Sequence, residues 1–218
     1  VGAAGPVGDA STSTMIVELV PRTIVGTGST LIGGRNLAAS DLAGLVRIGA
    51  YAGSDIGLVA DSDVSATLLT RGGTRATIIA VVRPTVTIES NSQIQAANRV
   101  FISNWSSSNI RATVTGGAGN TLGDFLRTLF TNLGSALSNP PTLLSSGETL
   151  LVMNVDVDSS IVIGANSQIV SDTISLSSVA MNAVDARSSM TSKGTLLAQA
   201  TTITIFNLPV RDILKGYI

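Results

Sequence analysis

Three short stretches of this sequence resemble one another: VTIESNSQI at 86–94, IVIGANSQI at 161–169 and, more faintly, TIVGTGSTL at 23–31. Each copy has an aliphatic residue, then Gly or Glu, and a Ser three residues after that Gly or Glu. Gly, Asn and Ser favour turns, and aliphatic residues flank them on both sides. The repeat therefore predicts a strand that enters a turn and continues as another strand, which indicates architecture rather than chemistry.

The same pattern also matches one hexapeptide rung of a parallel β-helix. The copies start at Thr23, Val86 and Ile161, so their spacing is long and unequal. A solenoid built from such rungs needs consecutive repeats, because each rung buries its face on the next. On this ground we expect no β-helix. We expect equivalent corners of a duplicated β unit, with chance recurrence of a common turn sequence as the alternative.

Short runs rich in Val, Ile and Thr fill residues 46–115 and resume after residue 149, separated by Gly, Asp, Asn and Ser. This punctuation is typical of antiparallel β architectures. Gly72 and Gly73 in TRGGTRA (70–76) match the requirement of a tight hairpin for positive φ. We therefore predict a mainly β fold, an antiparallel β-sandwich or jelly-roll-like arrangement.

One segment, about 120–137, breaks the β pattern and predicts an amphipathic helix that covers the sheet. Thr121 and Asp124 have the spacing of a capping box, and Pro140 and Pro141 follow the segment. Its apolar residues recur at steps of three and four: Leu122, Phe125, Leu126, Leu129, Phe130 and Leu133. A role in subunit contact is the alternative to covering the sheet, and a second, shorter helix is expected over 36–46.

The domain organisation follows from these patterns. Residues 1–12 are rich in Gly and Ala without any period, so we expect a flexible N-terminal arm. Residues 13–218 are expected to form a single β-rich domain. An alternative is two related β halves, about 13–115 and 149–218, joined by the helix.

Charged residues are sparse, at 12% of the chain with a formal net charge of −1, against about 25% in ordinary globular domains. Little electrostatic repulsion would keep copies apart, which favours self-association. No membrane span is expected, because no apolar run of sufficient length is present. The chain starts at Val1 without Met, which fits proteolytic maturation and export, and we expect an extracellular or cell-surface protein.

Catalytic chemistry finds little support in the composition. The chain has no His and no Cys, so Ser–His and Cys–His pairs and the common zinc sites are excluded. A Ser–Lys arrangement around Lys193 is the formal exception. We expect no enzyme activity, no catalytic residues and no cofactor, and no nucleic-acid partner because basic residues do not cluster with aromatics.

Three polar features remain as candidate sites. The pairs Asp61/Asp63 and Asp156/Asp158 place two carboxylates on one face of a strand, where they could contribute to a calcium site, although neither matches a recognised calcium loop. Asn104 in NWS has the form of an N-glycosylation site and would then be exposed.

These features lead to a functional hypothesis: a structural subunit of an extracellular homopolymer, such as a pilus-like fibre or sheath, whose partners are copies of itself. Its N-terminal segment would complete a neighbour's sheet by donor-strand exchange. A viral or phage coat subunit and a secreted ligand-binding module are the alternatives. The candidate donor residues are Met15, Ile16, Val17, Leu19 and Val20.

Overall fold

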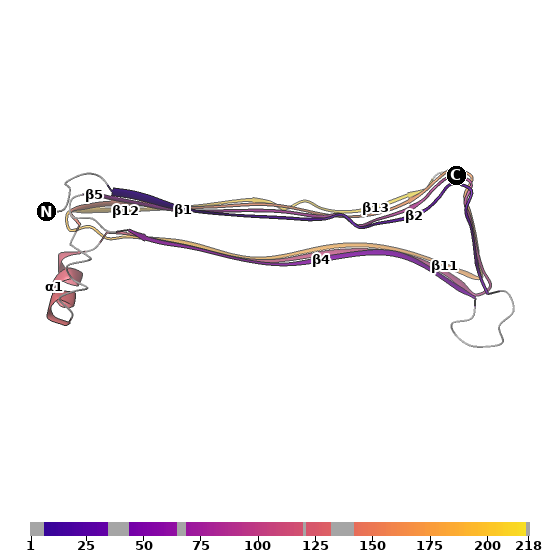
Figure 1. The fold of residues 1–218 in the computed structure, drawn as a ribbon, viewed down its shortest axis with the longest axis horizontal. Helices are drawn as coiled ribbons and strands as arrows, with labels where there is room; N and C mark the ends of the chain where they lie inside the picture. Colours follow the sequence, from indigo (N-terminus) through magenta and orange to yellow (C-terminus); the bar gives the residue numbers. More distant parts are fainter. Residues whose placement is uncertain (1–6, 35–43, 65–68, 120, 132–141, 217–218) are drawn as a thin grey trace.

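The computed structural model describes residues 7–34, 44–64, 69–119, 121–131 and 142–216, and most of these residues lie in β-strands. The chain winds through successive coils, and each full coil crosses a long layer, a short side and a second long layer (Figure 1). The mainly β prediction is confirmed. The first coil contains β1 (Val7–Leu19), β2 (Arg22–Val25), β3 (Thr30–Gly33) and β4 (Leu45–Val64).

The later coils repeat this order. The second coil contains β5 (Leu69–Val82), β6 (Thr85–Ile88), β7 (Gln93–Ala96) and β8 (Arg99–Ala118). The helix α1 (Leu122–Thr131) precedes the third coil, which contains β9 (Leu144–Ile163), β10 (Gln168–Val170) and β11 (Thr173–Ser192). A further half coil contains β12 (Leu197–Asn207) and β13 (Val210–Gly216).

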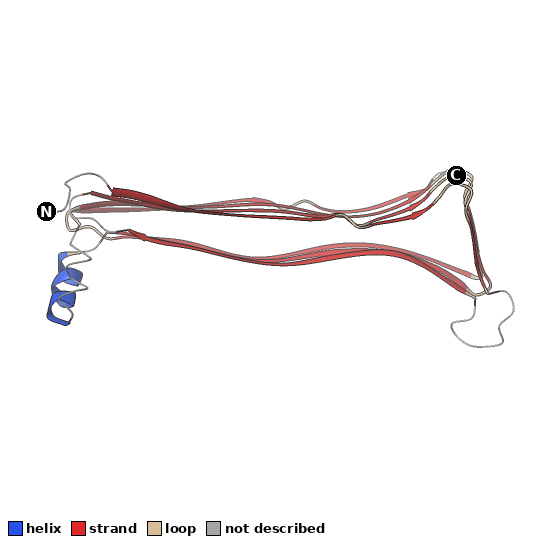
Figure 2. Ribbon diagram, viewed as in Figure 1, coloured by secondary structure: helices blue, strands red, loops and turns tan. Residues whose placement is uncertain are grey.

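All strand pairs of the described residues are parallel, so the predicted antiparallel sandwich is wrong. The first long sheet is formed by β1, β2, β5, β6, β9, β12 and β13; the short sheet has the order β10-β7-β3 and the second long sheet β11-β8-β4. Figure 2 shows the strands of the two long layers and of the short side in red. Val7 pairs with Thr70, Leu69 with Leu144, and Leu144 with Leu197. The sequence offset between paired strands is therefore long and changes from coil to coil, and the fold is a flattened parallel β-helix with very long coils.

The predicted hairpin at 70–76 is also wrong, because Gly72 and Gly73 lie inside β5. Gly72 has a different role, since a Cβ there would come 2.9 Å from the carbonyl oxygen of Gly117 on the opposite layer. The glycine therefore permits a close approach of the two long sheets at this position.

The repeated phrase forms a corner between the first long sheet and the short sheet. Gly28, Asn91 and Asn166 occupy the same corner position in the three coils, with φ of 69°, 60° and 58°. Gly and Asn tolerate this left-handed conformation better than other residues. The phrase thus marks equivalent corners, as predicted, but they belong to the β-helix that the spacing argued against.

The recurrent Ser of this phrase links the second and third corners to the preceding coil. The Oγ atom of Ser92 lies 3.0 Å from the carbonyl oxygen of Gly26, and Ser167 Oγ donates to the carbonyl of Glu89 at 2.8 Å. Thr27 adds a further link, because its backbone N–H and its hydroxyl donate to Glu89 Oε2 at 2.8 and 2.7 Å. These two hydrogen bonds lower the pKa of Glu89.

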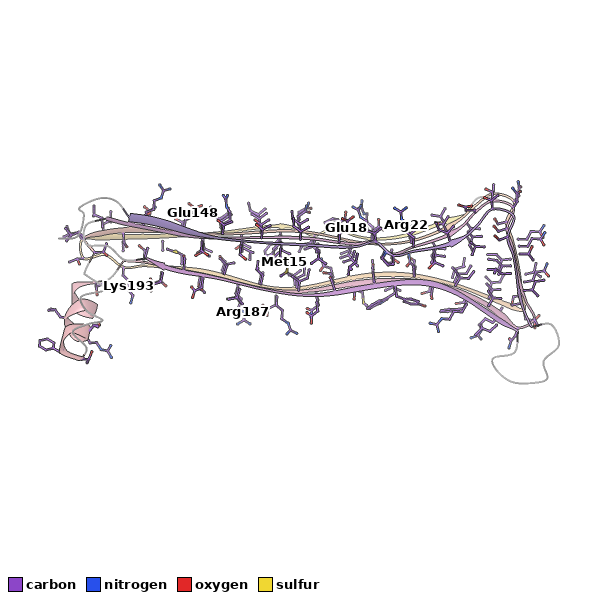
Figure 3. The ribbon with its side chains drawn as sticks, in the orientation of Figure 1. Met15, Glu18, Arg22, Glu148, Arg187 and Lys193 are labelled. Carbon is purple, nitrogen blue, oxygen red and sulfur yellow. The ribbon has the colours of Figure 1, made fainter. Side chains whose placement is uncertain are left out.

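The core lies between the facing long sheets, where alternate side chains point inward. Ile78 of β5, Ile110 of β8 and Met153 of β9 are fully buried there. Figure 3 shows Met15 pointing between the long layers, whereas Glu148 and Arg187 point away from them. Burial of each such apolar side chain contributes about 1.5–3 kcal/mol, so the inward rows hold the coils together.

The predicted helix is present as α1, but it does not cover the sheet. It projects at one end of the long layers (Figure 1), and the apolar side chains of Leu126 and Phe130 are 42% and 86% exposed. Residues 120 and 132–137 of the predicted range lie outside the described residues.

The predicted N-terminal arm and the predicted short helix lie only in part within the described residues. Residues 7–12 of the predicted flexible arm belong to β1, whereas residues 1–6 lie outside the described part of the chain. Most of the short helix expected over 36–46 also lies outside it, and its last two residues, Leu45 and Val46, begin β4.

Candidate functional site

The candidate donor strand is β1, and it pairs with its own chain. Its thirteen residues are in parallel register with β5. Met15 and Val17 pack against the core, and Ile16 points outward with 69% exposure; Leu19 ends the strand and Val20 follows it. On its other side β1 has no pairing partner among the described strands, so that edge presents free backbone groups.

The strand β12 forms an edge at the opposite end of the same sheet. It pairs with β9 on one side and with no described strand on the other. Its sequence, LAQATTITIFN, has eleven residues without charge and without Pro. Ile203, Ile205 and Phe206 are 39%, 50% and 49% exposed. Natural edge strands are usually protected by Lys, Pro or bulges, so β12 is an unprotected edge.

The absence of charge over 197–207 is visible in the sequence, and so is the run of β-branched residues. The sequence interpretation missed this segment as a functional surface because nothing in the sequence indicates which strands lie at an edge. The composition shows that β12 lacks the residues that normally protect an edge strand. Only the strand pairing shows that β12 lies at the edge of the sheet.

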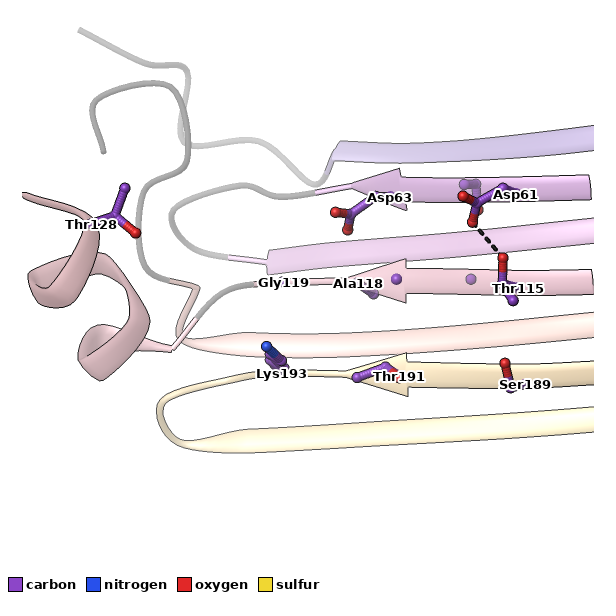
Figure 4. Close-up of a pocket in the computed structure, with 12 residues that line it drawn as sticks. Asp61, Asp63, Thr115, Ala118, Gly119, Thr128, Ser189, Thr191 and Lys193 are labelled. Atoms are coloured by element: carbon purple, nitrogen blue, oxygen red, sulfur yellow. Dashed lines mark hydrogen bonds between the residues drawn. The ribbon is translucent and has the colours of Figure 1, made fainter. Parts of the chain in front are cut away.

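Asp61 and Asp63 line a cleft of about 560 Å³ beside α1, at one end of the second long sheet (Figure 4). Asp61 Oδ1 accepts a hydrogen bond of 2.6 Å from the hydroxyl of Thr115. Lys193 lines the same cleft and places a positive charge there. Within the described part of the chain, no group of three or more carboxylate, His or Cys side chains could hold a metal ion.

Asp156 and Asp158 lie on the outer face of the first long sheet. Asp156 forms ion pairs with Arg83 and with Arg211, the latter at 3.1 Å. The hydrogen bond to Asp156 raises the pKa of Arg83. The two guanidinium groups flank Asp156 from neighbouring coils, so this carboxylate links three coils. A calcium ion would have to compete with both arginines for it.

Asn104 points into the interior and is 1% exposed. Its Nδ2 donates to the carbonyl oxygen of Pro84 at 2.7 Å and to that of Ser160 at 2.8 Å. The expectation that Asn104 is exposed is therefore wrong, because β8 alternates in and out and residue 104 falls on the inner side. A glycan at this position would not fit inside the coil.

Comparison of the chain with protein-family models, curated proteins and solved structures found no match. Among the described residues, no helix is long and apolar enough to cross a membrane.

Proposed function

We propose that the chain is a structural subunit of an extracellular, self-assembling homopolymer, in which copies join through the edge strands of their coils. The observation that carries this proposal is the uncharged edge of β12, with Ile203 and Ile205 exposed beside it. An exposed, long and apolar edge strand is a template for pairing with another chain. A second copy of the chain supplies such a partner in the free edge of β1.

The internal stacking of the chain supports this interaction. Within one chain, β1, β5, β9 and β12 follow one another in parallel register. A strand from a second copy would continue the same pairing pattern. Only two charged residues, Asp9 and Glu18, lie in β1, and the net charge of the chain is −1. Electrostatic repulsion between stacked copies is consequently small.

Edge pairing requires less rearrangement than donor-strand exchange. An exchanged β1 would have to leave its thirteen-residue pairing with β5 and remove Met15 and Val17 from the core. In edge pairing, β1 keeps these contacts and uses only its free side. We therefore expect β1 to remain in its own sheet in the assembled state.

The test compares two double variants on the same outer face. Ile203→Lys/Ile205→Lys places charge on the edge strand β12, whereas Leu150→Lys/Val152→Lys places it at the paired positions of the interior strand β9. Negative-stain microscopy and solution mass should show rods or sheaths for the unsubstituted chain and for the β9 variant. The β12 variant should remain at the 22.1 kDa of one chain, with unchanged circular dichroism.

Three results would contradict this proposal. A 22.1 kDa monomer of the unsubstituted chain at all concentrations would exclude self-assembly. Equal loss of assembly in both double variants would show that the outer face rather than the edge makes the contact. Closed shells in place of rods would favour the coat-subunit alternative.

A further inference from the structure

Although aromatic residues make up only 3% of the chain, three of them lie along the same stretch of the outer face of the second long sheet. Tyr51 of β4 pairs with Trp105 of β8, and Phe101 lies four residues before Trp105 on the same face. Tyr51 is 49% exposed, and Phe101 and Trp105 are partly buried. We call Tyr51, Phe101 and Trp105 the aromatic platform.

Glycines beneath the platform allow two rings to lie along the sheet. A Cβ on Gly49 would come 2.7 Å from Cε2 and 2.8 Å from the hydroxyl of Tyr51, so this ring occupies the space above Gly49. A Cβ on Gly53 would lie 3.6 Å from Cζ3 of Trp105. Each of these two rings therefore extends over a position that has no side chain, and the exposed part of Tyr51 remains open to solvent.

A cation is fixed at the border of the platform. The guanidinium carbon of Arg47 lies 5.5 Å from the ring centre of Phe101 and 6.0 Å from that of Tyr51. Arg47 also donates a hydrogen bond of 3.1 Å to the Tyr51 hydroxyl, which is hydrogen-bonded to Ser103 as well. Among the described ion pairs, none neutralises Arg47.

We propose that Arg47 and the aromatic platform form a binding site for an acidic sugar unit of a glycan. The apolar C–H face of a pyranose ring stacks on Tyr51 and Trp105, because aromatic rings present large, flat and weakly hydrated surfaces. The sugar carboxylate binds the planar guanidinium of Arg47. A hydroxyl group of the sugar finds a partner in the hydroxyl of the exposed Tyr51.

The charges of the surrounding face favour a sugar over a nucleic acid. Arg99 lies on the outward side of β8, two residues before Phe101, and adds positive charge at this end. Further along the same face the outward residues have mixed charge, with Asp55, Asp61 and Asp63 on β4, Arg111 on β8 and Arg187 on β11. A nucleic acid needs a basic surface that follows its phosphates, whereas a single acidic sugar needs only the local cation.

The fluorescence of the protein offers a direct test, since Trp105 is the only tryptophan in the chain. The unsubstituted chain is titrated with trigalacturonate and with its neutral counterpart galactotriose, while tryptophan emission is recorded. Trigalacturonate should give a saturable change in emission and bind at least about tenfold more tightly than galactotriose. This difference corresponds to about 1.4 kcal/mol of binding free energy.

Variants separate the stacking contact from the charge contact. Tyr51→Ala should weaken the binding of trigalacturonate about tenfold or more, and Arg47→Gln should remove its advantage over galactotriose. Val59→Ala changes an exposed residue elsewhere on β4 and should leave binding unchanged. Circular dichroism identifies any variant that fails to fold, and the wild-type preference for trigalacturonate tests the proposal without variants.

Three results would overturn this proposal. The first is the absence of a saturable emission change with trigalacturonate. The second is equal affinity for the neutral trisaccharide. The third is tighter binding of a single-stranded oligothymidylate than of trigalacturonate, which would indicate stacking of nucleobases. None of these results bears on assembly through β12, which is tested separately.

Discussion

Removal of the Asn104 side chain should destabilise the fold strongly, because this residue bridges two coils from the inside. Asn104→Ala removes two hydrogen bonds, to the carbonyls of Pro84 and Ser160. Each is worth about 0.5–1.5 kcal/mol net, and a buried acceptor left unpaired costs about 1–3 kcal/mol more. The carbonyl of Pro84 keeps a second hydrogen bond, of 3.3 Å, from the backbone N–H of Ser160, so this further cost does not apply to it. The Oδ1 atom of Asn104 has no partner in the described structure, and its removal offsets part of this cost. We expect a net loss of about 2–3 kcal/mol.

The assay is thermal unfolding followed by circular dichroism, with urea unfolding for the free energy. For a chain of this length, about 2–4 °C of Tm correspond to 1 kcal/mol, so the Tm should fall by about 4–12 °C. Asn109→Ala is the matched control, because Asn109 lies on the same strand and its amide makes only an exposed hydrogen bond, to Asp55. Its effect should stay within about 0.5 kcal/mol.

A carboxylate at position 104 distinguishes the bridge from a simple loss of volume. Asn104→Asp preserves the size of the side chain but faces both carbonyls with acceptors instead of donors. It should be more destabilising than Asn104→Ala at neutral pH. Burial raises the pKa of such a carboxyl group, so stability should recover as the pH falls and the group is protonated. Wild-type stability of Asn104→Ala, or no pH dependence for Asn104→Asp, would refute the bridge.

Three further changes test the corner and the platform. Asn91→Val should lower the free energy of unfolding in urea by about 1–2 kcal/mol, because a β-branched residue is unfavourable at φ of 60°, whereas Asn91→Gly should be tolerated. Hydrogen bonds from Thr27 lower the pKa of Glu89. They therefore stabilise the fold at pH values above the ordinary pKa of Glu, and this stabilisation is lost as the pH falls through the lowered pKa of Glu89. Thr27→Val should therefore lower the Tm at neutral pH and have no effect in acid, and equal effects at both would contradict this. The hydrogen bond with Ser103 is the main cause of the lowered pKa of Tyr51, so Ser103→Ala should raise that pKa in an absorbance titration of tyrosinate, and an unchanged titration would exclude this cause.

The sequence predicted strands, the turns at the repeated corners and the amphipathic helix, because these depend on local patterns. Alternation of inward and outward residues in β8 and β9 has a period of two, whether the neighbouring strands run parallel or antiparallel. Turn-forming residues such as Asn91 and Asn166 likewise mark a corner in either arrangement. The direction of pairing was therefore not determined by the patterns that identified the strands.

The spacing of the repeated phrase was the clue to parallel pairing, and two insertions concealed it. The connection from β3 to β4 is longer than the one from β7 to β8, and the connection from β8 to β9 contains α1. The first addition lengthens the offset from β1 to β5, and the second lengthens the offset from β5 to β9. Both offsets are therefore longer than the one from β9 to β12. Since a β-helix was expected to repeat at a short and constant interval, the unequal spacing was interpreted as evidence against it.

Both proposed surfaces depend on register, and this explains why the sequence did not reveal them. Tyr51 and Trp105 are far apart in the sequence and become neighbours only when β4 pairs with β8. Aromatic residues are scarce in this chain, but stacking requires local concentration of rings rather than a high overall number. The same reasoning applies to β12, whose uncharged sequence is unremarkable in a buried strand and significant at an edge. In a fold with long coils, the sequence offset between paired strands therefore determines which residues become neighbours on the outer faces.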